Sequence, residues 1–341
     1  MSSSPNILFI TADQLGARDL GSYGSGVAST PTLDALATYG TRFTRCYANH
    51  PSCAPNRACL LTGRTRVAHG LVKNNYCLPP DVPTYAQLLK SNGYHTAAFG
   101  KLHQHPMFSP VPRQAEHLGF DEAVITEDPK WGPWIEWVRE KSPEHYPTAL
   151  AMCWDWDESL VHAADEEELR LYRKVRPAFL EKTRKEGHWP AMYASELPAE
   201  LHDTAFITDQ ALAFLRRHQT SPASSPFFCH VSYVDPHDPY DPPAPYATMF
   251  RPEEMPSPIP KTWSDERFPA LRNSQDFHDF HRIHEDRQAI AELRALFHGS
   301  LRFVDDHIGR LVSYLEENDL WKNTLVVFTS DHGEMLGDHG L

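Results

Sequence analysis

The chain has 341 residues, of which 41% are hydrophobic and 23% charged, and it carries a formal net charge of −13. This length is sufficient for one large α/β enzyme domain with a sizeable core. The acidic balance argues against nucleic acid or an anionic membrane as the main partner, so any anion site must be a local concentration of positive charge.

The N-terminal residues carry no signal-peptide pattern, and no segment of the sequence is long and apolar enough to span a bilayer. The sequence therefore predicts a cytoplasmic location. The six cysteines are sparse for this length and form no Cys-x-x-Cys pair, which is typical of reduced thiols in a cytosolic protein. One of them, Cys53, lies in a context that indicates chemistry.

Apolar runs of strand length alternate with amphipathic stretches along the chain. The predicted strands cover residues 6–10, 42–47, 96–99, 227–234 and 325–329. The predicted helices cover residues 31–40, 53–63, 83–91, 203–217 and 289–316. Strands that alternate with helices predict an α/β/α sandwich around a large, mainly parallel sheet.

Several predicted strands finish in polar residues at their carboxyl ends. Asp13, Lys101, His237 and Asp331 each follow such a run. Ligands of open α/β sheets bind beyond the carboxyl ends of the strands. The four side chains are therefore expected to converge on one site.

Two stretches interrupt the alternation and are predicted to be irregular insertions, namely residues 124–200 and 240–285. Such insertions often serve as lids or specificity loops in α/β enzymes. The first contains Trp154 and Trp156, which could surround a sugar or an organic cation or could form a structural core.

The strongest local signal is the stretch from Cys53 to Arg57. Cys53 is predicted to begin a helix, whose N-terminus favours an anion, and Arg57 lies one turn later on the same face. A lone cysteine is more often a small buried hydrophobe. Pro55 and the following Thr-Gly-Arg of residues 62–64 favour a functional role.

These residues resemble the Cys-x-Pro-x-Arg signature of the formylglycine-dependent sulfatases, which belong to the alkaline-phosphatase-like superfamily. The resemblance extends from residue 6 to residue 341, with gaps in the insertions. It implies that a formylglycine-generating enzyme oxidises Cys53 to formylglycine (3-oxoalanine), which acts as the nucleophile.

The resemblance also implies a metal site. Its ligands would be Asp13, Gln14, residue 53, Asp331 and His332. Many relatives carry a second Asp where this chain has Gln14, which can still ligate through its carbonyl oxygen. Oxygen-rich ligation implies one divalent ion, with Ca²⁺ first and Mn²⁺ or Mg²⁺ as alternatives.

Further residues match the family's catalytic positions. Arg57 and Lys101 would offset the charge of the transferring group, and His103 would hold the hydrated aldehyde and act as a base. His237 would bind the substrate and donate a proton to the leaving oxygen. Asn74 would contact the anion.

The implied function is hydrolysis of a small anionic sulfate ester to an alcohol and inorganic sulfate. The pair Asp13 and Gln14 is similar to that of choline-sulfatases and phosphonate monoester hydrolases. A phosphonate monoester or phosphodiester hydrolase is therefore one alternative, although those enzymes replace Lys101 and His103 with hydroxyl residues. A catalytically silent metal-binding domain is another.

Relatives continue beyond the equivalent of Leu341 with a lysine that contacts the sulfate and with a smaller C-terminal subdomain. The sequence is thus interpreted as a sulfatase catalytic domain, residues 1–341, that is truncated at its C-terminal end. A homo-oligomeric assembly is left open by the sequence.

Overall fold

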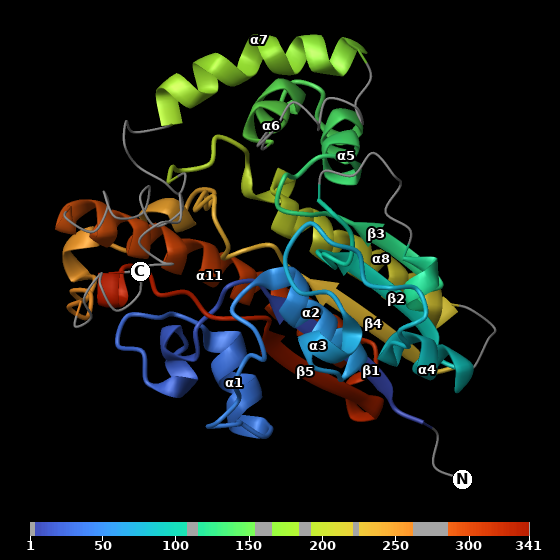
Figure 1. The fold of residues 1–341 in the computed structure, drawn as a ribbon. Helices are drawn as coiled ribbons and strands as arrows, with labels where there is room; N and C mark the ends of the chain where they lie inside the picture. Colours follow the sequence, from blue (N-terminus) through green and yellow to red (C-terminus); the bar gives the residue numbers. More distant parts are fainter. Residues whose placement is uncertain are drawn as a thin grey trace.

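The computed structural model describes residues 4–107, 115–153, 166–183, 192–220, 225–261 and 286–340. Its centre is a parallel sheet with the strand order β3-β2-β4-β1-β5 (Figure 1). The strands are β1 (Asn6–Ala12), β2 (His95–Gly100), β3 (Glu122–Ile125), β4 (Phe227–Ser232) and β5 (Thr324–Ser330). The parallel direction places all five carboxyl ends at one edge of the sheet.

Helices cover both faces of this sheet, as the sequence predicts for an α/β/α sandwich (Figure 1). The helices are α1 (Pro31–Tyr39), α2 (Cys53–Thr62), α3 (Arg66–His69), α4 (Tyr85–Ser91), α5 (Pro133–Lys141), α6 (Tyr146–Met152), α7 (Glu166–Thr183), α8 (Asp203–Thr220) and α11 (Arg287–Glu317). Helices α2 and α4 pack on one face, and α8 and α11 on the other.

Side chains of the central strand β4 belong alternately to the two hydrophobic cores, one on each face of the sheet. Phe228 packs with Ala54 and Ala58 of α2, whereas Cys229 and Val231 face the cluster that includes α8 and α11. Every residue of β4 is buried, which is typical of a central strand covered on both faces and explains the mainly apolar sequence of residues 227–234.

Four of the five predicted strands are confirmed, and one prediction is wrong. Residues 42–47 form no strand, and their side chains are exposed, including Phe43 at 69% and Tyr47 at 81%. A short stretch with apolar residues makes a strand only where a partner strand satisfies its backbone. Strand β3 lies outside the predicted strands, because a run of four residues is too short to identify by itself.

The predicted helices are confirmed with small shifts of their ends. Helix α4 begins after Thr84, whose side chain and that of Gln87 form a reciprocal capping box. The stretch 124–200 is less irregular than expected, because its described part contains α5, α6 and α7. Trp154, Trp156 and residues 262–285 lie outside the described residues.

Within the described part of the chain, none of the helices combines the length and the apolar character that a membrane crossing requires.

Candidate active site

The site lies beyond the carboxyl ends of the strands, where the sequence placed it. Asp13 follows β1, Lys101 follows β2, and Asp331 follows β5. Cys53 is the first residue of α2, so its side chain lies at the positive end of that helix. Ligand atoms of Asp13, Cys53, Asp331 and His332 all lie within 4.8 Å of one another.

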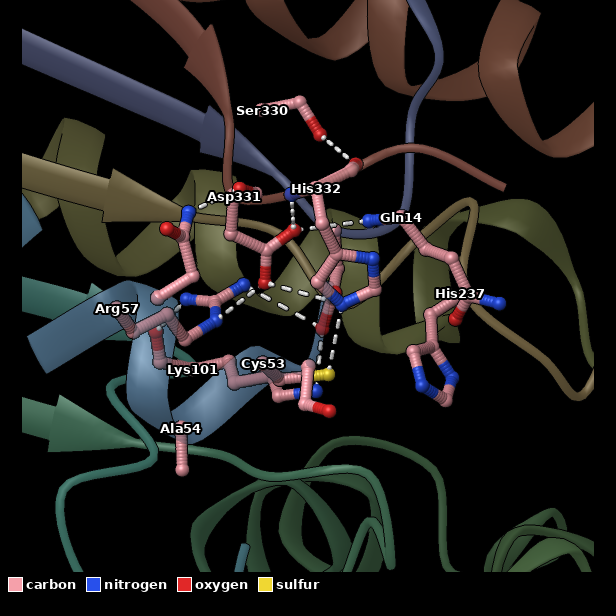
Figure 2. Close-up of polar contacts among 12 residues, drawn as sticks. Gln14, Cys53, Ala54, Arg57, Lys101, His237, Ser330, Asp331 and His332 are labelled. Atoms are coloured by element: carbon pink, nitrogen blue, oxygen red, sulfur yellow. Dashed lines mark hydrogen bonds and ion pairs between the residues drawn. The ribbon is translucent and has the colours of Figure 1, made fainter. Parts of the chain in front are cut away.

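This group of four has the composition of a cation site (Figure 2). Cys53 Sγ lies 3.0 Å from His332 Nε2. Asp13 is fully buried, and among the described residues its Oδ1 accepts no hydrogen bond. A buried carboxylate oxygen without a donor is costly unless a cation binds it. Carboxylate oxygens and one imidazole nitrogen therefore fit a divalent metal.

Gln14 adjoins this group but makes its own contacts. Its backbone N–H donates to Asp331 Oδ1 at 3.0 Å, and its side-chain Nε2 donates to Glu334 Oε2. The φ of Gln14 is +62°, an uncommon value that turns the chain sharply after β1. Ligation through the Gln14 carbonyl oxygen stays a prediction.

Arg57 neutralises the two metal-site carboxylates. Its Nε donates to Asp331 Oδ2 at 2.8 Å, and its Nη2 lies 3.3 Å from Asp13 Oδ2. Its Nη1 donates to Ser232 Oγ at 2.8 Å and to the carbonyl of Lys101 at 2.7 Å. Burial would lower the pKa of Arg57, but the two carboxylates raise it above its ordinary value. The guanidinium is thus a fixed positive charge.

The ammonium of Lys101 is completely buried between two carboxylates. It pairs with Asp13 Oδ2 and with Asp128 Oδ1. Burial would lower the pKa of Lys101, but Asp128 and Asp13 hold it well above its ordinary value. Lys101 and Arg57 are thus two buried cations of the site, and together they pair with three carboxylates, Asp13, Asp128 and Asp331.

His103 presents a neutral imidazole inside the site. It is 0% exposed, and neither ring nitrogen has a hydrogen-bond partner among the described residues. Burial and the charge of Lys101 lower the pKa of His103 to about 3. Its backbone N–H donates to Glu127 Oε1 at 2.9 Å, which fixes the turn. The low pKa makes this imidazole a weak base on its own, and the support for a role in proton transfer is that both ring nitrogens are unengaged among the described residues.

His237 presents a protonated imidazole to the same space. Its Nδ1 lies 2.7 Å from the carbonyl of Asp238 and 3.2 Å from Asp238 Oδ1. Burial would lower the pKa of His237, but Asp238, Asp128 and Asp13 raise it well above its ordinary value. In Figure 2 His237 and Arg57 lie on opposite sides of Cys53. His237 can therefore donate a proton there.

Two asparagines hold the start of α2. The backbone N–H of Ala54 donates to Asn74 Oδ1 at 3.1 Å. Asn56 Oδ1 accepts from the backbone N–H groups of Asn49 and His50, and its Nδ2 donates to the carbonyl of Asp331. Asn74 therefore lies beside Cys53, and its contact with an anion stays a prediction.

The metal-site residues perturb one another strongly. Burial would raise the pKa of Asp13, but Lys101 and Arg57 hold it well below its ordinary value. Burial and the adjacent Asp13 raise the pKa of Asp331. Burial would lower the pKa of His332, but Asp331 and Cys53 raise it to about 10. Such strong mutual perturbation is typical of a functional site.

Sequence reasoning missed the contribution of the strand β3. Asp128, three residues after β3, has a ligand atom within 4.8 Å of those of Asp13 and His237. The signal was present, because the apolar run 123–125 ends in Thr126, Glu127 and Asp128, as the other strands end in polar residues.

Three comparisons with known proteins agree with this geometry. Residues 5–341 match the family model described as Sulfatase. The chain is 30% identical to an arylsulfatase of Clostridium perfringens over 98% of its length, and 26% identical to a choline-sulfatase of Rhizobium meliloti over its whole length. The crystal structure of the phosphonate monoester hydrolase of Agrobacterium radiobacter superposes on 99% of the chain, with a TM-score of 0.73 and 25% identity.

The chain spans only part of each of these relatives. It covers 64% of the arylsulfatase, 59% of the choline-sulfatase and 64% of the phosphonate monoester hydrolase. The matched part nevertheless includes the five strands and the residues that converge at their carboxyl ends. From its sequence match, its fold and its site, the chain belongs to the sulfatase family of the alkaline-phosphatase-like superfamily.

Proposed function

We propose that the protein hydrolyses sulfate monoesters to an alcohol and inorganic sulfate, with formylglycine at position 53 as the nucleophile. The observation that carries the proposal is the convergence of Asp13, Cys53, Asp331 and His332 within 4.8 Å. Cys53 lies beside a cation site and also at a helix N-terminus, which suits a residue that must bind an anion.

One divalent metal would bind to Asp13, Asp331 and His332, with Gln14 as a further ligand. We propose Ca²⁺, with Mn²⁺ or Mg²⁺ as alternatives, because the ligand set is rich in oxygen. When bound, such an ion acts as a Lewis acid toward a sulfate oxygen and toward the hydroxyl of residue 53.

The cationic side chains would bind the sulfate group. Arg57 and Lys101 are buried and already paired with carboxylates, so their charges need no reorganisation when a substrate arrives. Preorganised donors of this kind usually supply the largest rate term, and each is worth about 3 kcal/mol.

Two histidines would each carry out one proton transfer: one would donate a proton to the leaving group, and the other would accept a proton from residue 53. Water adds to the aldehyde of residue 53 and gives it two hydroxyls. One hydroxyl would lose its proton to solvent and form a new O–S bond, while His237 gives a proton to the leaving oxygen as the S–O bond of the ester breaks. The sulfate is then bound to residue 53. His103, which is neutral, would take the proton of the second hydroxyl of residue 53, so that the aldehyde forms again and sulfate leaves.

The first test asks whether Cys53 is modified. The protein would be produced together with a formylglycine-generating enzyme and digested with trypsin, and the mass of the peptide of residues 46–57 would be measured. We expect this peptide to lose the sulfur of one of its two cysteines. Cys53→Ala is the control, in which Cys46 keeps its thiol.

The second test measures turnover of a chromogenic aryl sulfate with and without a chelator. We expect hydrolysis by the modified protein, loss of activity on chelation and recovery with Ca²⁺. A modified, metal-loaded protein without turnover would support a silent metal-binding domain instead.

The phosphonate monoester hydrolase neighbours favour a second candidate within the same superfamily. Such a hydrolase could use the same nucleophile and metal. Lys101 and His103 favour the sulfate ester, because we expect hydroxyl residues at these positions in the phosphonate hydrolases. Rates on an aryl sulfate and an aryl phosphonate monoester, measured side by side, separate the two activities.

A further inference from the structure

A second group of buried charged residues contains none of the proposed metal ligands and none of the residues given a step in the proposed reaction. We name it the buried charge cluster; it consists of Lys130, His202, Asp203, Asp235 and Asp241. Each of these residues is at most 2% exposed. They come from three parts of the chain, namely the segment after β3, the start of α8 and the loop after β4.

Lys130 lies at the centre of the charges. Its Nζ donates to Asp241 Oδ2 at 2.9 Å and to Asp241 Oδ1 at 3.2 Å, and it lies 3.3 Å from Asp203 Oδ1. Burial would lower the pKa of Lys130, but Asp203 and Asp241 hold it well above its ordinary value. The ammonium thus provides the positive charge that these carboxylates need.

His202 joins the two ends of one loop. Its Nδ1 lies 3.0 Å from Asp203 Oδ1 and 3.7 Å from Asp235 Oδ2, and its Nε2 lies 3.6 Å from Asp241 Oδ1. Asp235 is held further by Thr204, whose Oγ1 donates to Asp235 Oδ2 at 2.5 Å. His202 therefore lies between the first and last residues of the loop 235–241, and Lys130 pairs with the last of them, Asp241.

His237 lies in this loop, between Asp235 and Asp241. The same β3 segment also carries Asp128, which pairs with Lys101 and has a carboxylate oxygen within 4.8 Å of a His237 ring nitrogen. Burying five ionisable groups is expensive, and well-packed apolar residues would often be as stable or more stable. The cluster is thus better explained by the position that it imposes than by stability.

We infer that Lys130 is a positioning residue: it holds the Asp241 end of the 235–241 loop, His202 and Thr204 hold the Asp235 end, and the loop so held aims the imidazole of His237 at the leaving oxygen. The inference rests on the proposed function for the identity of the leaving oxygen. Among the described residues, the carboxylates that pair with Lys130 are Asp241 and Asp203, neither of which is a proposed metal ligand, so Lys130 would act through them.

The test uses two aryl sulfates that share the sulfate group and differ in the leaving group. Nitrophenolate leaves without a proton, whereas an unactivated phenolate needs one. We expect Lys130→Met to lower kcat/KM for unactivated phenyl sulfate by about 10²-fold, within the range of general-acid contributions, and for nitrophenyl sulfate only a few-fold. A purely structural defect would lower both rates equally and would overturn the inference.

A second variant guards against misfolding. Lys130→Met leaves Asp241 without its ammonium, whereas Lys130→Met combined with Asp241→Asn removes both charges of the pair. We expect the double variant to fold and to keep the leaving-group defect. Lys130→Arg should restore most of the unactivated rate. Asp305→Asn is the matched control, because Asp305 is equally buried but binds the start of α1.

A spectroscopic measurement makes the test independent of turnover. In protein labelled with ¹⁵N-histidine, the ring signals of His237 can be assigned by their loss in His237→Gln. We expect Lys130→Met to shift these signals and Asp305→Asn to leave them in place. Unchanged His237 signals in Lys130→Met would overturn the inference, whereas a wild-type protein that hydrolyses no sulfate ester would overturn only the proposed function.

Discussion

The Nε of Arg57 donates to the Oδ2 of Asp331 at 2.8 Å, although the two residues are 274 positions apart in the chain. Arg57 lies within α2, and Asp331 follows β5 at the edge of the sheet. The same guanidinium lies 3.3 Å from Asp13 after β1. One cation thus holds together the carboxylates from both ends of the sequence, and a metal would bind to these same carboxylates.

Replacing Arg57 should separate catalysis from metal binding. We expect Arg57→Ala to lower kcat for an aryl sulfate by about 10²- to 10³-fold, because a preorganised donor to the sulfate is lost. The apo protein should lose about 3–5 kcal/mol of stability, since buried Asp331 loses its paired guanidinium and Asp13 keeps only Lys101. Ca²⁺ should then raise the melting temperature more than it does in the wild type.

The control for this variant is Arg302→Ala. Arg302 pairs with Asp306 at 2.7 Å one turn away on α11, outside the site. We expect little change in its activity or its response to Ca²⁺. Wild-type kcat in Arg57→Ala would show that the guanidinium has no part in the reaction.

Metal binding should be visible as thermal stabilisation. A ligand that binds the folded state at about 100 times its dissociation constant adds about 2.7 kcal/mol, so Ca²⁺ should raise the melting temperature and a chelator should reverse the effect. Asp13→Asn and Asp331→Asn should abolish this response. Asp305→Asn should keep it, and a response to Ca²⁺ that survives in Asp13→Asn would contradict the site.

His103→Asn should expose the second half of the reaction. We expect nitrophenolate to be released in a burst of about one equivalent, followed by turnover slowed by about 10²- to 10⁴-fold, because the base for the second hydroxyl is missing. Stopped-flow absorbance measures the burst, and the mass of the peptide of residues 46–57 should show bound sulfate. Wild-type steady-state turnover in this variant would exclude the role.

Gly100 should tolerate no side chain. Its φ is +98°, and a Cβ there would lie 1.9 Å from the carbonyl oxygen of Ser232, on the neighbouring strand β4. We expect Gly100→Ala to destabilise the protein by several kcal/mol, on the order of the strain of a left-handed residue plus a backbone clash. Urea unfolding measures this loss, and Gly63→Ala, whose Cβ meets no atom within 4 Å, isolates the effect of positive φ alone.

Buried neutral histidines should make the fold sensitive to acid. Burial, together with Arg310, lowers the pKa of His307 from 6.5 to about 3, so between these values the unfolded chain binds a proton that the folded chain does not. The free energy of unfolding should therefore fall as the pH falls through this window, by about 1.4 kcal/mol per pH unit for one proton.

The variant His307→Gln tests this contribution. Urea unfolding at several pH values between about 6.5 and about 3 should give a slope that is smaller by roughly one proton. Identical slopes in the two proteins would mean that His307 titrates alike in the folded and unfolded chains. The glutamine can still face Thr208 Oγ1, which lies 3.0 Å from His307 Nδ1.

Much of the architecture is encoded locally. Short apolar runs predicted β1, β2, β4 and the edge strand β5, and the amphipathic stretch 83–91 predicted α4. Residues 42–47 were predicted in the same way but form no strand, because local sequence alone does not provide a partner strand. Strand β3, with four residues, is too short to be recognised by itself.

The sequence by itself determined the family signature at Cys53 and the polar residues that end each strand, since these features depend on local order and spacing. Only the tertiary structure decided that Asp128 joins Lys101 and His237, that His202 lies between Asp235 and Asp241, and that Lys130 pairs with Asp241. The reason is physical: contacts between buried charges depend on the order of the strands in the sheet and on the turns after them. Neither the order of the strands nor the course of these turns can be predicted from the spacing of residues along the chain.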